Sequence, residues 1–392
     1  MHHADRKAAK LIFLRHYLPG FRSGGPLRSI ANLVEHLGAE TDLRIVTLDR
    51  DIGDAASFPG IEIGRWQFVG NAQVMYLPAV PNLGTVSALL RATPHELIYL
   101  QSAFDPHFSI LPLIANRLRG RDARPVLLAP RGEFSPGALA LKAPKKRLFM
   151  ALARATGLWR GVTWQASADN ERVHILAQIG PSARIAQASD IPSLAPEAPP
   201  APAPSDLLRV AFLSRISPKK NLAGALNMLA RLPASVPVRF TIYGPQEDAE
   251  CWQDCAVRIA RLPNHVSAKW GGSVPPEQVH ATLAGHDLFL FPTFGENFGH
   301  VIVDAMSAGL PLLLSDQTPW RELAERGVGA DLPLADTGAF VRWIEDYAAM
   351  TQPERQAMRA AVLALASTVT KPTLALEANR TMLQTALQTG RP

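Results

Sequence analysis

The sequence has little of what membrane-spanning, secreted or zinc-binding proteins need. No apolar run approaches the roughly 20 residues that cross a bilayer as a helix. Residues 1–7 lack a long apolar segment before the first expected strand, so we expect no secretory signal. The chain has only two cysteines, Cys251 and Cys255, whose spacing on an expected helix argues against a disulfide, and no further Cys/His set suggests zinc. These absences favour a reducing compartment, and we expect a cytoplasmic protein.

Charge is distributed unevenly along the chain. The formal net charge is +6, with +7 in residues 1–200 and −1 in the remainder. A basic half predicts an anionic partner, such as a phosphorylated substrate, a membrane surface or nucleic acid. Because no nucleic-acid-binding module and no interleaving of basic and aromatic residues is apparent, we expect no nucleic-acid partner.

The pattern of apolar runs predicts an α/β protein. The length of 392 residues favours two domains. Expected strands in the first half lie at 10–14, 43–48, 74–77, 97–100 and 126–129, with helices at 27–37, 84–92 and 107–118. Such alternation is typical of a doubly wound parallel sheet with helices on both faces.

A Pro/Ala-rich segment, 192–204, forms the clearest boundary and has the composition of a semi-rigid linker. Beyond it, strands are expected at 208–214, 237–243, 266–270, 287–291 and 311–315, with helices at 221–231, 248–260, 276–284 and 299–308. After Ala335 the chain is expected to be helical to Gln388. The prediction is therefore two Rossmann-like domains that face a cleft, where sites are commonly found.

The glycine-rich loop at 19–26 follows the first expected strand and carries Gly24 and Gly25 before Pro26. Proline suits the first turn of a helix, and free amides at such a start can bind an anion. A mere turn explains the loop equally well, and the dinucleotide-binding Gly-x-Gly-x-x-Gly pattern is absent.

Two further strand ends of the first domain carry polar side chains. Asp105 either contacts a ligand or simply caps the next helix. Arg131 and Glu133 follow a later strand, and an arginine between a proline and a glycine has little structural reason to be there. We therefore expect Arg131 to contact a ligand.

Residues 138–160 are expected to form a helix that is both basic and apolar, with Lys145 and Lys146 beside Leu148 and Phe149. Peripheral contact with an anionic membrane at its inner face is one interpretation. A solvated charged surface is the other, and the sequence leaves both open.

The densest polar chemistry lies at two strand ends of the second domain. Arg215 leaves the strand at 208–214 and Lys220 precedes the next helix, and both cations suit phosphate oxygens. Glu296 follows the strand at 287–291, and a helix start near Gly299 would offer amides and a positive dipole end to the same anion. A surface lysine pair and a plain helix cap are the alternatives. Together the groups predict a sugar-nucleotide site.

The segment 295–311, Gly-Glu-Asn-Phe-Gly-His-Val-Ile-Val-Asp-Ala-Met-Ser-Ala-Gly-Leu-Pro, resembles the Glu-x7-Glu segment of the retaining GT-B glycosyltransferases of family four. Arg215 and Lys220 resemble the family's arginine followed five residues later by lysine. Loops at 24–26, 243–245 and 270–274 also fall where the family has its loops. The likeness runs along nearly the whole chain.

The resemblance implies a role for each matching residue. Glu296 would contact the donor sugar, while Arg215 and Lys220 would bind the diphosphate and stabilise the leaving nucleotide. The implied donor-binding residues are Gly24 and Gly25 at the distal phosphate, Gly244, Gly272 and Val274 near the base, Asn297, Phe298, Gly299 and His300 around the sugar phosphate, and Asp304 at the ribose. Asp105, Arg131 and Glu133 would face the acceptor or the cleft.

The chain also departs from the family pattern. Asp304 stands where a second glutamate is usual and is one methylene shorter, and Asn221 replaces a glycine. Gln101 and Ser102 occupy a loop where the family often has a histidine, so we name no base in the first domain. The resemblance further implies that residues 371–392 cross back to a first domain of residues 1–195, leaving 206–370 as the donor domain.

We therefore expect a retaining glycosyltransferase that moves a sugar from a nucleotide-diphosphate sugar to a glycan or lipid-linked glycan in surface polysaccharide or glycolipid biosynthesis. No cofactor and no metal is expected, because we recognise no metal-binding Asp-x-Asp triplet and the cations would replace a divalent ion. The alternatives are a nucleotide-sugar epimerase or glycan phosphorylase of the same fold, and a non-catalytic sugar-nucleotide-binding protein.

Overall fold

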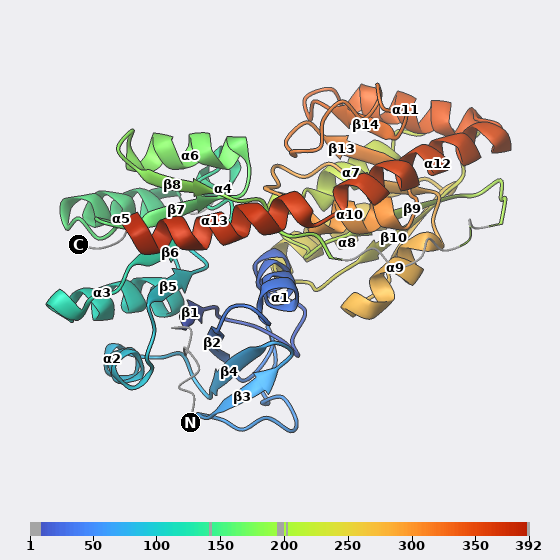
Figure 1. The fold of residues 1–392 in the computed structure, drawn as a ribbon. Coiled ribbons are helices and arrows are strands. Elements are labelled where there is room, and N and C mark those ends of the chain that lie inside the picture. The colour runs from blue at the N-terminus through green and yellow to red at the C-terminus, as the bar shows by residue number, and fades with distance from the viewer. Residues whose placement is uncertain (1–8, 141–142, 194–199, 201–202, 390–392) are drawn as a thin grey trace. The chain divides into compact units, whose positions relative to one another are not determined.

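The computed structural model describes residues 9–140, 143–193, 200 and 203–389, which fall into two compact units (Figure 1). The first unit comprises residues up to Ile191 and the C-terminal segment from Thr373, and the second spans Pro192–Pro372. Each unit has its own sheet of largely parallel strands. The predicted α/β fold with two doubly wound domains is confirmed. Most of the expected linker lies outside the described residues, as do residues 141–142 of the expected helix at 138–160.

The sheet of the first unit has the strand order β3-β4-β2-β1-β5-β6-β7-β8, in which only the β3–β4 pair is antiparallel. Its strands are β1 (Lys10–Phe13), β2 (Leu43–Leu48), β3 (Trp66–Val69), β4 (Ala72–Leu77), β5 (Leu97–Leu100), β6 (Val126–Leu128), β7 (Thr163–Ala166) and β8 (Arg184–Gln187). Strand β1 pairs with both β2 and β5, so the strand order reverses at β1. The loops after β1 and β5 flank this point.

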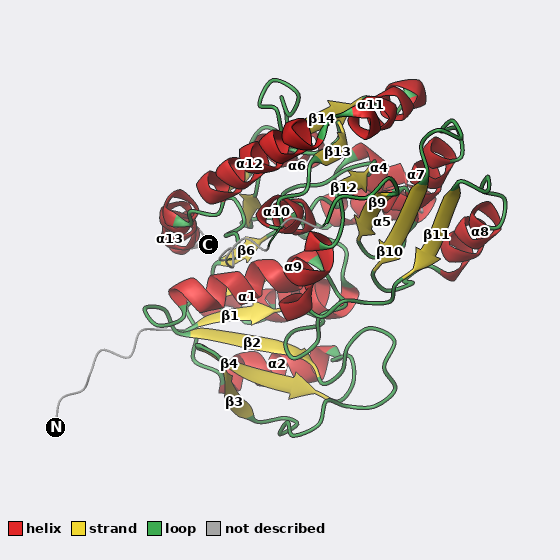
Figure 2. Ribbon diagram, turned by 90° about the vertical axis from the view of Figure 1, so that its right-hand side faces the viewer, coloured by secondary structure: helices red, strands yellow, loops and turns green. Residues whose placement is uncertain are grey.

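Helices cover both faces of this sheet, and Figure 2 shows α1 and α2 on opposite sides of β1, β2 and β4. The helices are α1 (Gly25–Leu37), α2 (Leu83–Ala92), the π-helical turn η1 (Pro106–Ile110), α3 (Leu111–Arg117), the 3-10 turn η2 (Gly120–Asp122), α4 (Pro136–Ala140), α5 (Ala143–Ala155), α6 (Asp169–Ile179) and α13 (Thr373–Thr389). Alternate residues of β1 enter two cores: Leu11 packs with α2 and α3, and Ile12 packs with α1 and α13.

The expected helix at 138–160 is wrong in its extent. The described part of this segment contains α4 and α5, and α5 ends at Ala155. Gly157 and Gly161 follow with φ angles of 58° and 80°, a left-handed conformation that a right-handed helix cannot include.

The sheet of the second unit has six parallel strands in the order β11-β10-β9-β12-β13-β14. They are β9 (Leu208–Leu213), β10 (Val238–Tyr243), β11 (Val266–Trp270), β12 (Leu288–Phe291), β13 (Leu312–Ser315) and β14 (Gly329–Leu332). All four residues of β12 are fully buried, as expected for a central parallel strand covered on both faces.

Helices of the second unit form two layers. They are the 3-10 turn η3 (Pro218–Lys220), α7 (Leu222–Leu229), α8 (Ala249–Ile259), α9 (Pro276–Ala284), α10 (His300–Ser307), α11 (Thr337–Ala349) and α12 (Gln352–Val369). Helix α7 packs against α8 and α11, whereas α10 packs against α9 and α12. Strands β9 and β12 are neighbours although β10 and β11 lie between them in sequence. Ligands of such sheets bind beyond the carboxyl ends of the strands at this reversal.

Candidate active site

Lys220 and Glu296 form an ion pair at the reversal between β9 and β12. Lys220 ends the turn η3 after β9, and Glu296 lies in the loop after β12. The lysine Nζ donates to Glu296 Oε1, and the two side chains are only 13% and 12% exposed. Lys220 Nζ also lies 5.6 Å from the ring centroid of Phe291, the last residue of β12. The two loops that were predicted to share one site are therefore in direct contact.

Backbone and hydroxyl hydrogen bonds hold these loops together. The Phe294 amide donates to the Lys219 carbonyl at 2.9 Å, and the Thr293 hydroxyl donates to the same carbonyl at 3.2 Å. The Thr293 hydroxyl also lies 3.3 Å from Glu296 Oε1. The Glu296 amide donates to the carbonyl of Gln317 at 3.0 Å. Both members of the ion pair thus sit on backbone that is fixed by neighbouring strand ends.

Asn221 explains one departure from the family pattern. It caps α7 in the left-handed conformation, with φ 56° and ψ 42°, a region that glycine and asparagine tolerate best. Its side-chain oxygen accepts from the Gly224 amide at 3.2 Å, and its side-chain nitrogen donates to the Pro292 carbonyl at 2.8 Å. Asparagine therefore meets the conformational need that a glycine would meet and adds a link between the two loops.

Positive charge surrounds Glu296. Burial alone would raise the pKa of its carboxyl, but Lys220, Lys219 and Arg215 together hold that pKa below its ordinary value. Glu296 is therefore an ionised acceptor of hydrogen bonds at neutral pH. Arg215 itself pairs with Glu247, in the loop after β10, at 2.6 Å.

The start of α10 lies directly after this cluster. Gly299 precedes the helix in the left-handed conformation, with φ 77°, and no side chain of the described residues caps the helix. The side-chain nitrogen of Asn297 is buried and has no hydrogen-bond partner among the described residues. An unmatched donor beside an uncapped helix start provides the setting in which an anionic ligand is bound.

An aromatic cluster fixes the backbone before α10. The Trp320 indole donates to the Phe298 carbonyl at 2.6 Å, and the two rings lie 5.9 Å apart. The buried His300 ring lies 4.9 Å from the Phe298 ring. Asp304 lies one turn further along α10 and is partly buried. Its contact with a ribose remains a prediction.

The expected border of the nucleotide base lies at the ends of β10 and β11. Gly244 has φ 124°, and a Cβ there would lie 2.0 Å from the Ser214 carbonyl oxygen, so only glycine allows β9 and β10 to approach. Its amide donates to the Gly272 carbonyl at 2.9 Å, and its carbonyl accepts from the Trp270 indole. Gly272 has φ 87° and faces open space, since a Cβ there would meet no atom within 4 Å, and Val274 packs on the core.

In the first unit, Gly24 adopts φ 74° immediately before α1, and Gly25 is the first residue of that helix. Asp51, after β2, shapes the loop in front of them: its carboxylate accepts from the Phe21 amide at 2.7 Å and the Arg22 amide at 3.0 Å. The sequence prediction overlooked this residue, although its position after a strand was a signal.

Asp51 also belongs to an Asp-x-Asp triplet, Asp49-Arg50-Asp51, that the sequence prediction passed over. The Asp49 carboxylate accepts hydrogen bonds from the Arg50 guanidinium at 2.8 Å and from the Ser57 hydroxyl at 2.5 Å. The described residues contain no group of three His, Cys, Asp or Glu side chains that could hold a metal ion. Their helices also include none long and apolar enough to cross a membrane.

Asp105 and Glu133 meet through Ser102. The Ser102 hydroxyl donates to Glu133 at 2.7 Å and accepts from the Asp105 amide at 2.9 Å, and the Ala103 amide donates to Glu133 at 2.6 Å. Burial raises the pKa of Glu133 to about 7, against the opposing effect of these hydrogen bonds. Asp105 caps η1 and accepts two hydrogen bonds from Arg15, at 2.8 and 2.9 Å. Capping, one of the two predicted alternatives for Asp105, is thus present.

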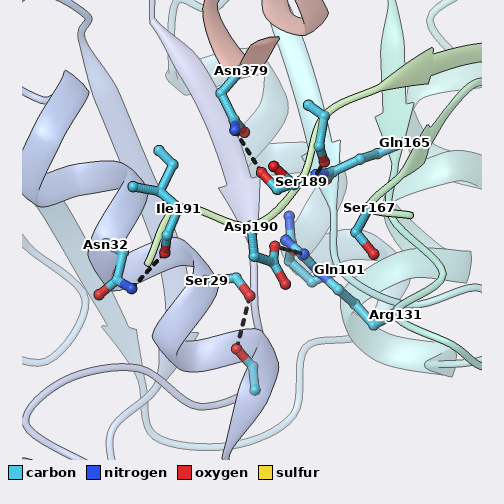
Figure 3. Close-up of polar contacts among 12 residues, drawn as sticks. Ser29, Asn32, Gln101, Arg131, Gln165, Ser167, Ser189, Asp190, Ile191 and Asn379 are labelled. Carbon is cyan, nitrogen blue, oxygen red and sulfur yellow. Dashed lines mark hydrogen bonds and ion pairs between the residues drawn. The ribbon is translucent and has the colours of Figure 1, made fainter. Parts of the chain in front are cut away.

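Arg131 has a structural role, and the expectation that it lacks one is wrong. Its side chain is 9% exposed, and its guanidinium pairs with Asp190 at 2.5 Å and donates to Gln101 at 2.7 and 3.0 Å (Figure 3). Asp190 lies in the segment after β8, and hydrogen bonds hold the residues on both sides of it. Asn32 of α1 donates to the Ile191 carbonyl, and Asn379 of α13 donates to the Ser189 carbonyl (Figure 3). Asp190 lies 59 residues further along the chain, which hid the pairing from a local pattern.

Comparison with known proteins adds to this geometry. Residues 197–361 match the sequence profile of the family described as "Glycosyl transferases group 1". The second unit belongs to this family. The match includes Arg215, Lys220, Glu296 and Asp304.

The individual proteins that are similar to this chain are distant relatives. O-antigen chain mannosyltransferase B of Escherichia coli is 30% identical over 125 residues, which are 31% of this chain and 32% of that protein. The match thus spans about a third of the length of this curated relative. The structure of HepE from Anabaena in complex with UDP-glucose has a TM-score of 0.68 at 17% identity, over 96% of this chain and 99% of that one.

WaaG, described as a glycosyltransferase involved in lipopolysaccharide biosynthesis, has a TM-score of 0.62 at 16% identity, over 95% of this chain and 99% of that one. At such identities the structures establish the fold, which is that of the GT-B glycosyltransferases. The family match and this fold together confirm the predicted resemblance to the group 1 glycosyltransferases of the GT-B fold, and the retaining mechanism stays a prediction.

Three residues of the group 1 unit were missed by the sequence prediction. Thr293 and Glu247 contact Glu296 and Arg215, and Trp320 fixes Phe298. Glu247 lies 32 residues from Arg215 and Trp320 lies 22 residues from Phe298, so no local spacing pointed to them. Only the sheet order brings these loops together.

Proposed function

We propose that this protein is a retaining glycosyltransferase that moves a hexose from a nucleotide-diphosphate sugar to a glycan or lipid-linked glycan. The observation that carries the proposal is the nearly buried Lys220–Glu296 ion pair at the β9–β12 reversal of a group 1 unit. The mannosyltransferase relative and the sugar-nucleotide complex of HepE support a donor of this class.

In this proposal Lys220 and Arg215 hold the donor diphosphate. Each has a carboxylate partner, Glu296 and Glu247, which keeps its cationic group in place before the donor arrives. The start of α10 at Gly299 adds backbone amides for the phosphate next to the sugar. With the charge of the leaving diphosphate stabilised by side-chain cations and amides, we propose that the reaction needs no resident metal and no cofactor.

The proposed chemistry breaks the bond between the anomeric carbon and the diphosphate oxygen and forms a bond from the acceptor oxygen to the same carbon. The acceptor proton passes to the released diphosphate oxygen, so the electron pair and the proton end on one leaving group. Glu296 stays ionised and accepts hydrogen bonds from sugar hydroxyls, which orients the donor. Catalysis then consists of positioning and charge stabilisation.

For the acceptor we propose a glycan or lipid-linked glycan of surface polysaccharide or glycolipid biosynthesis. Asp105 and Glu133, joined through Ser102 at the carboxyl edge of the first sheet, are the proposed contacts for acceptor hydroxyls. Arg131 pairs with Asp190 next to this edge of the sheet, and we propose that it positions the loops that carry Asp105 and Glu133.

Peripheral contact with an anionic membrane through α5 is a further part of the proposal, at the inner face of a cytoplasmic membrane. Leu148 and Leu152 lie one helical turn apart and are 64% and 56% exposed. Lys145 and Arg147 beside them are exposed as well. An apolar stripe flanked by cations is typical of helices that lie in a bilayer surface. Flotation with phosphatidylglycerol vesicles should fail for Leu148→Ser/Leu152→Ser and persist for Val173→Ser on α6.

The function is tested with the purified full chain and a panel of nucleoside diphosphates. One nucleotide should raise the melting temperature, and its sugar conjugate should release nucleoside diphosphate slowly in water and faster with a glycan acceptor. Release of an epimerised sugar without dependence on an acceptor would favour the epimerase. Stabilisation by a nucleotide with no turnover of any conjugate would favour a binding protein, and both results contradict the proposal.

A further inference from the structure

The basic excess of the first half of the chain comes from one segment. Between Arg117 and Arg160 the sequence has eleven Lys or Arg residues and two Asp or Glu residues, whereas the rest of residues 1–200 is slightly acidic. The donor site in the second unit uses none of these cations. Their clustering therefore needs a separate explanation.

Two pockets lie where this segment meets the amino-terminal edge of the first sheet, at the starts of β6, β7 and β8. One has a volume of about 550 Å³ and lies between α5 and α6, and the other has a volume of about 480 Å³ and lies beside α3. They share the lining residues Arg160, Gly161, Val162 and Arg184. Together they form one hollow, which we term the arginine pocket.

Five arginines line the arginine pocket: Arg117, Arg124, Arg154, Arg160 and Arg184. None of the described lining residues is acidic, and none of the five arginines forms an ion pair with a described residue. Where they do have partners, these are backbone carbonyls. Arg117 donates to the carbonyls of Gly157 and Arg160, and Arg154 donates to that of Gln178. A carbonyl orients a guanidinium without neutralising it.

Burial and the crowding of like charges lower the pKa values of arginines in and beside the pocket. Burial and the nearby Arg160 lower the pKa of Arg117. Burial and Arg124 lower the pKa of Arg119 in the same way, and this residue lies beside the pocket on the loop after α3. Like charges held together at a cost are typical of a surface that is completed by a bound anion.

The apolar wall of the pocket is fixed by aromatic packing. Trp159 lines the pocket and is 7% exposed, and its indole N–H is buried without a hydrogen-bond partner among the described residues. Its ring is fixed by edge contacts with Phe134, Phe149 and Trp164.

We propose that the arginine pocket binds a ligand that carries phosphate with two or more negative charges. A single carboxylate would pair with one guanidinium fork, whereas phosphate oxygens accept from several at once. The volume exceeds that of one phosphate, so a diphosphate or a phosphate on a larger body fits. Two sources share this chemistry: a free diphosphate, and the headgroups of an anionic phospholipid. No residue of the donor site takes part.

The test uses the full chain in a Lys220→Ala background, which weakens the donor site as a competing diphosphate site. Titration calorimetry with inorganic pyrophosphate at low ionic strength measures the remaining binding. Adding Arg160→Gln/Arg184→Gln should weaken it by at least about tenfold, since two charge-assisted contacts are lost. Adding Arg65→Gln/Arg172→Gln, two exposed arginines of the same unit outside the pocket, should leave it within about twofold.

A second arm separates the two sources. Vesicles of phosphatidylcholine with and without phosphatidylglycerol are presented to the same variants. Loss of pyrophosphate binding in the pocket variant supports a free diphosphate, and loss of vesicle binding alone supports a lipid headgroup.

Because Arg184 also bonds the Thr389 carbonyl, Arg124→Gln serves as a variant that removes no described hydrogen bond of its guanidinium. It should weaken the same binding without lowering the melting temperature. Unchanged affinity for pyrophosphate and for anionic vesicles in both pocket variants would overturn the proposal.

Discussion

Lys220 and Glu296 come from loops 76 residues apart in sequence and form an ion pair whose two side chains are 13% and 12% exposed. The pair closes the gap between the ends of β9 and β12. It keeps the glutamate ionised and holds the lysine side chain in place, so both groups are ready before a donor binds. In the proposed function a diphosphate shares Lys220 with Glu296, and this arrangement would place the sugar beside the carboxylate.

Glu296→Gln should lower turnover by at least about 100-fold, because an ionised acceptor for donor hydroxyls is lost. Lys220 is released from its partner, so the affinity for nucleoside diphosphate should persist or increase. Steady-state release of nucleoside diphosphate and calorimetry measure the two effects. Glu325→Gln, which changes an exposed glutamate in the loop before β14, is the control and should retain the turnover. Undiminished turnover in Glu296→Gln would refute the role of Glu296.

Asn221→Ala should destabilise the second unit by about 2 kcal/mol, because alanine is less stable than asparagine in the left-handed conformation and cannot cap α7. Asn221→Gly keeps the backbone conformation and should cost less than Asn221→Ala. Urea unfolding of both variants gives the comparison. Equal losses would show that the conformation of residue 221 contributes nothing and that only the side-chain hydrogen bonds matter.

Glu133 should make the stability of the first unit depend on pH. Burial raises its pKa to about 7 from an ordinary 4.5, so the folded state keeps a proton that the unfolded state has released between these values. Stability is therefore full below about pH 4.5 and decreases as the pH rises through about 7. Glu133→Gln, which keeps an acceptor for Ser102, should remove this slope. Near pH 8 it should be the more stable protein by on the order of 1–3 kcal/mol.

The measurement for Glu133 is urea unfolding of the parent and Glu133→Gln near pH 5 and near pH 8. The two proteins should be close in stability at the lower pH and separate at the higher. A stability difference that does not change with pH would contradict the buried, titrating carboxyl.

Arg131→Met should destabilise the first unit by about 3–5 kcal/mol, because Asp190 is left buried and unpaired. Adding Asp190→Asn should recover a large part of this loss. Denaturant unfolding of the single and double variants measures the coupling. Normal stability in Arg131→Met, together with weaker acceptor use, would instead support the contact with a ligand that the sequence suggested.

The strands that carry the proposed donor site were predictable from sequence because they lie in continuous apolar runs. Leu288–Phe291 and Leu312–Ser315 are buried on both faces, and each is followed by polar groups or glycine. The parallel α/β pattern placed the ends of these strands at one edge of a sheet, and the family resemblance assigned Lys220 and Glu296 to one site. The strand order that makes β9 and β12 neighbours came only from the structure.

Other elements left no such signal. Strand β14 begins at Gly329, where a Cβ would lie 1.9 Å from the Leu312 carbonyl oxygen, and it has only two apolar residues besides this glycine. Strand β3 is an antiparallel edge with Phe68 75% exposed, and α6 buries a glutamate, Glu171, on its inner side. These elements form because of their neighbours rather than their own pattern, so a reading of local periodicity omits them.

The site was predictable to the extent that its chemistry is local. Arg215, Lys220 and Glu296 stand at strand ends, and the start of α10 follows Gly299. Glu247 and Trp320, the partners of Arg215 and Phe298, depend on which loops the sheet order makes adjacent. Thr293 lies only three residues before Glu296 in the same loop, so its contact was within reach of a local pattern. Arg131 shows the converse error, because its partner Asp190 comes from a strand end that the local pattern did not identify.

The central claim is that Lys220 holds a nucleoside diphosphate at the β9–β12 reversal. Calorimetry of the nucleoside diphosphate that stabilises the protein most, with the parent and Lys220→Ala, tests it most directly. Losing one charge-assisted contact should weaken binding by about 10- to 100-fold, while Lys371→Ala, an exposed lysine elsewhere in the second unit, should change nothing. An equal affinity in the parent and Lys220→Ala would contradict the account.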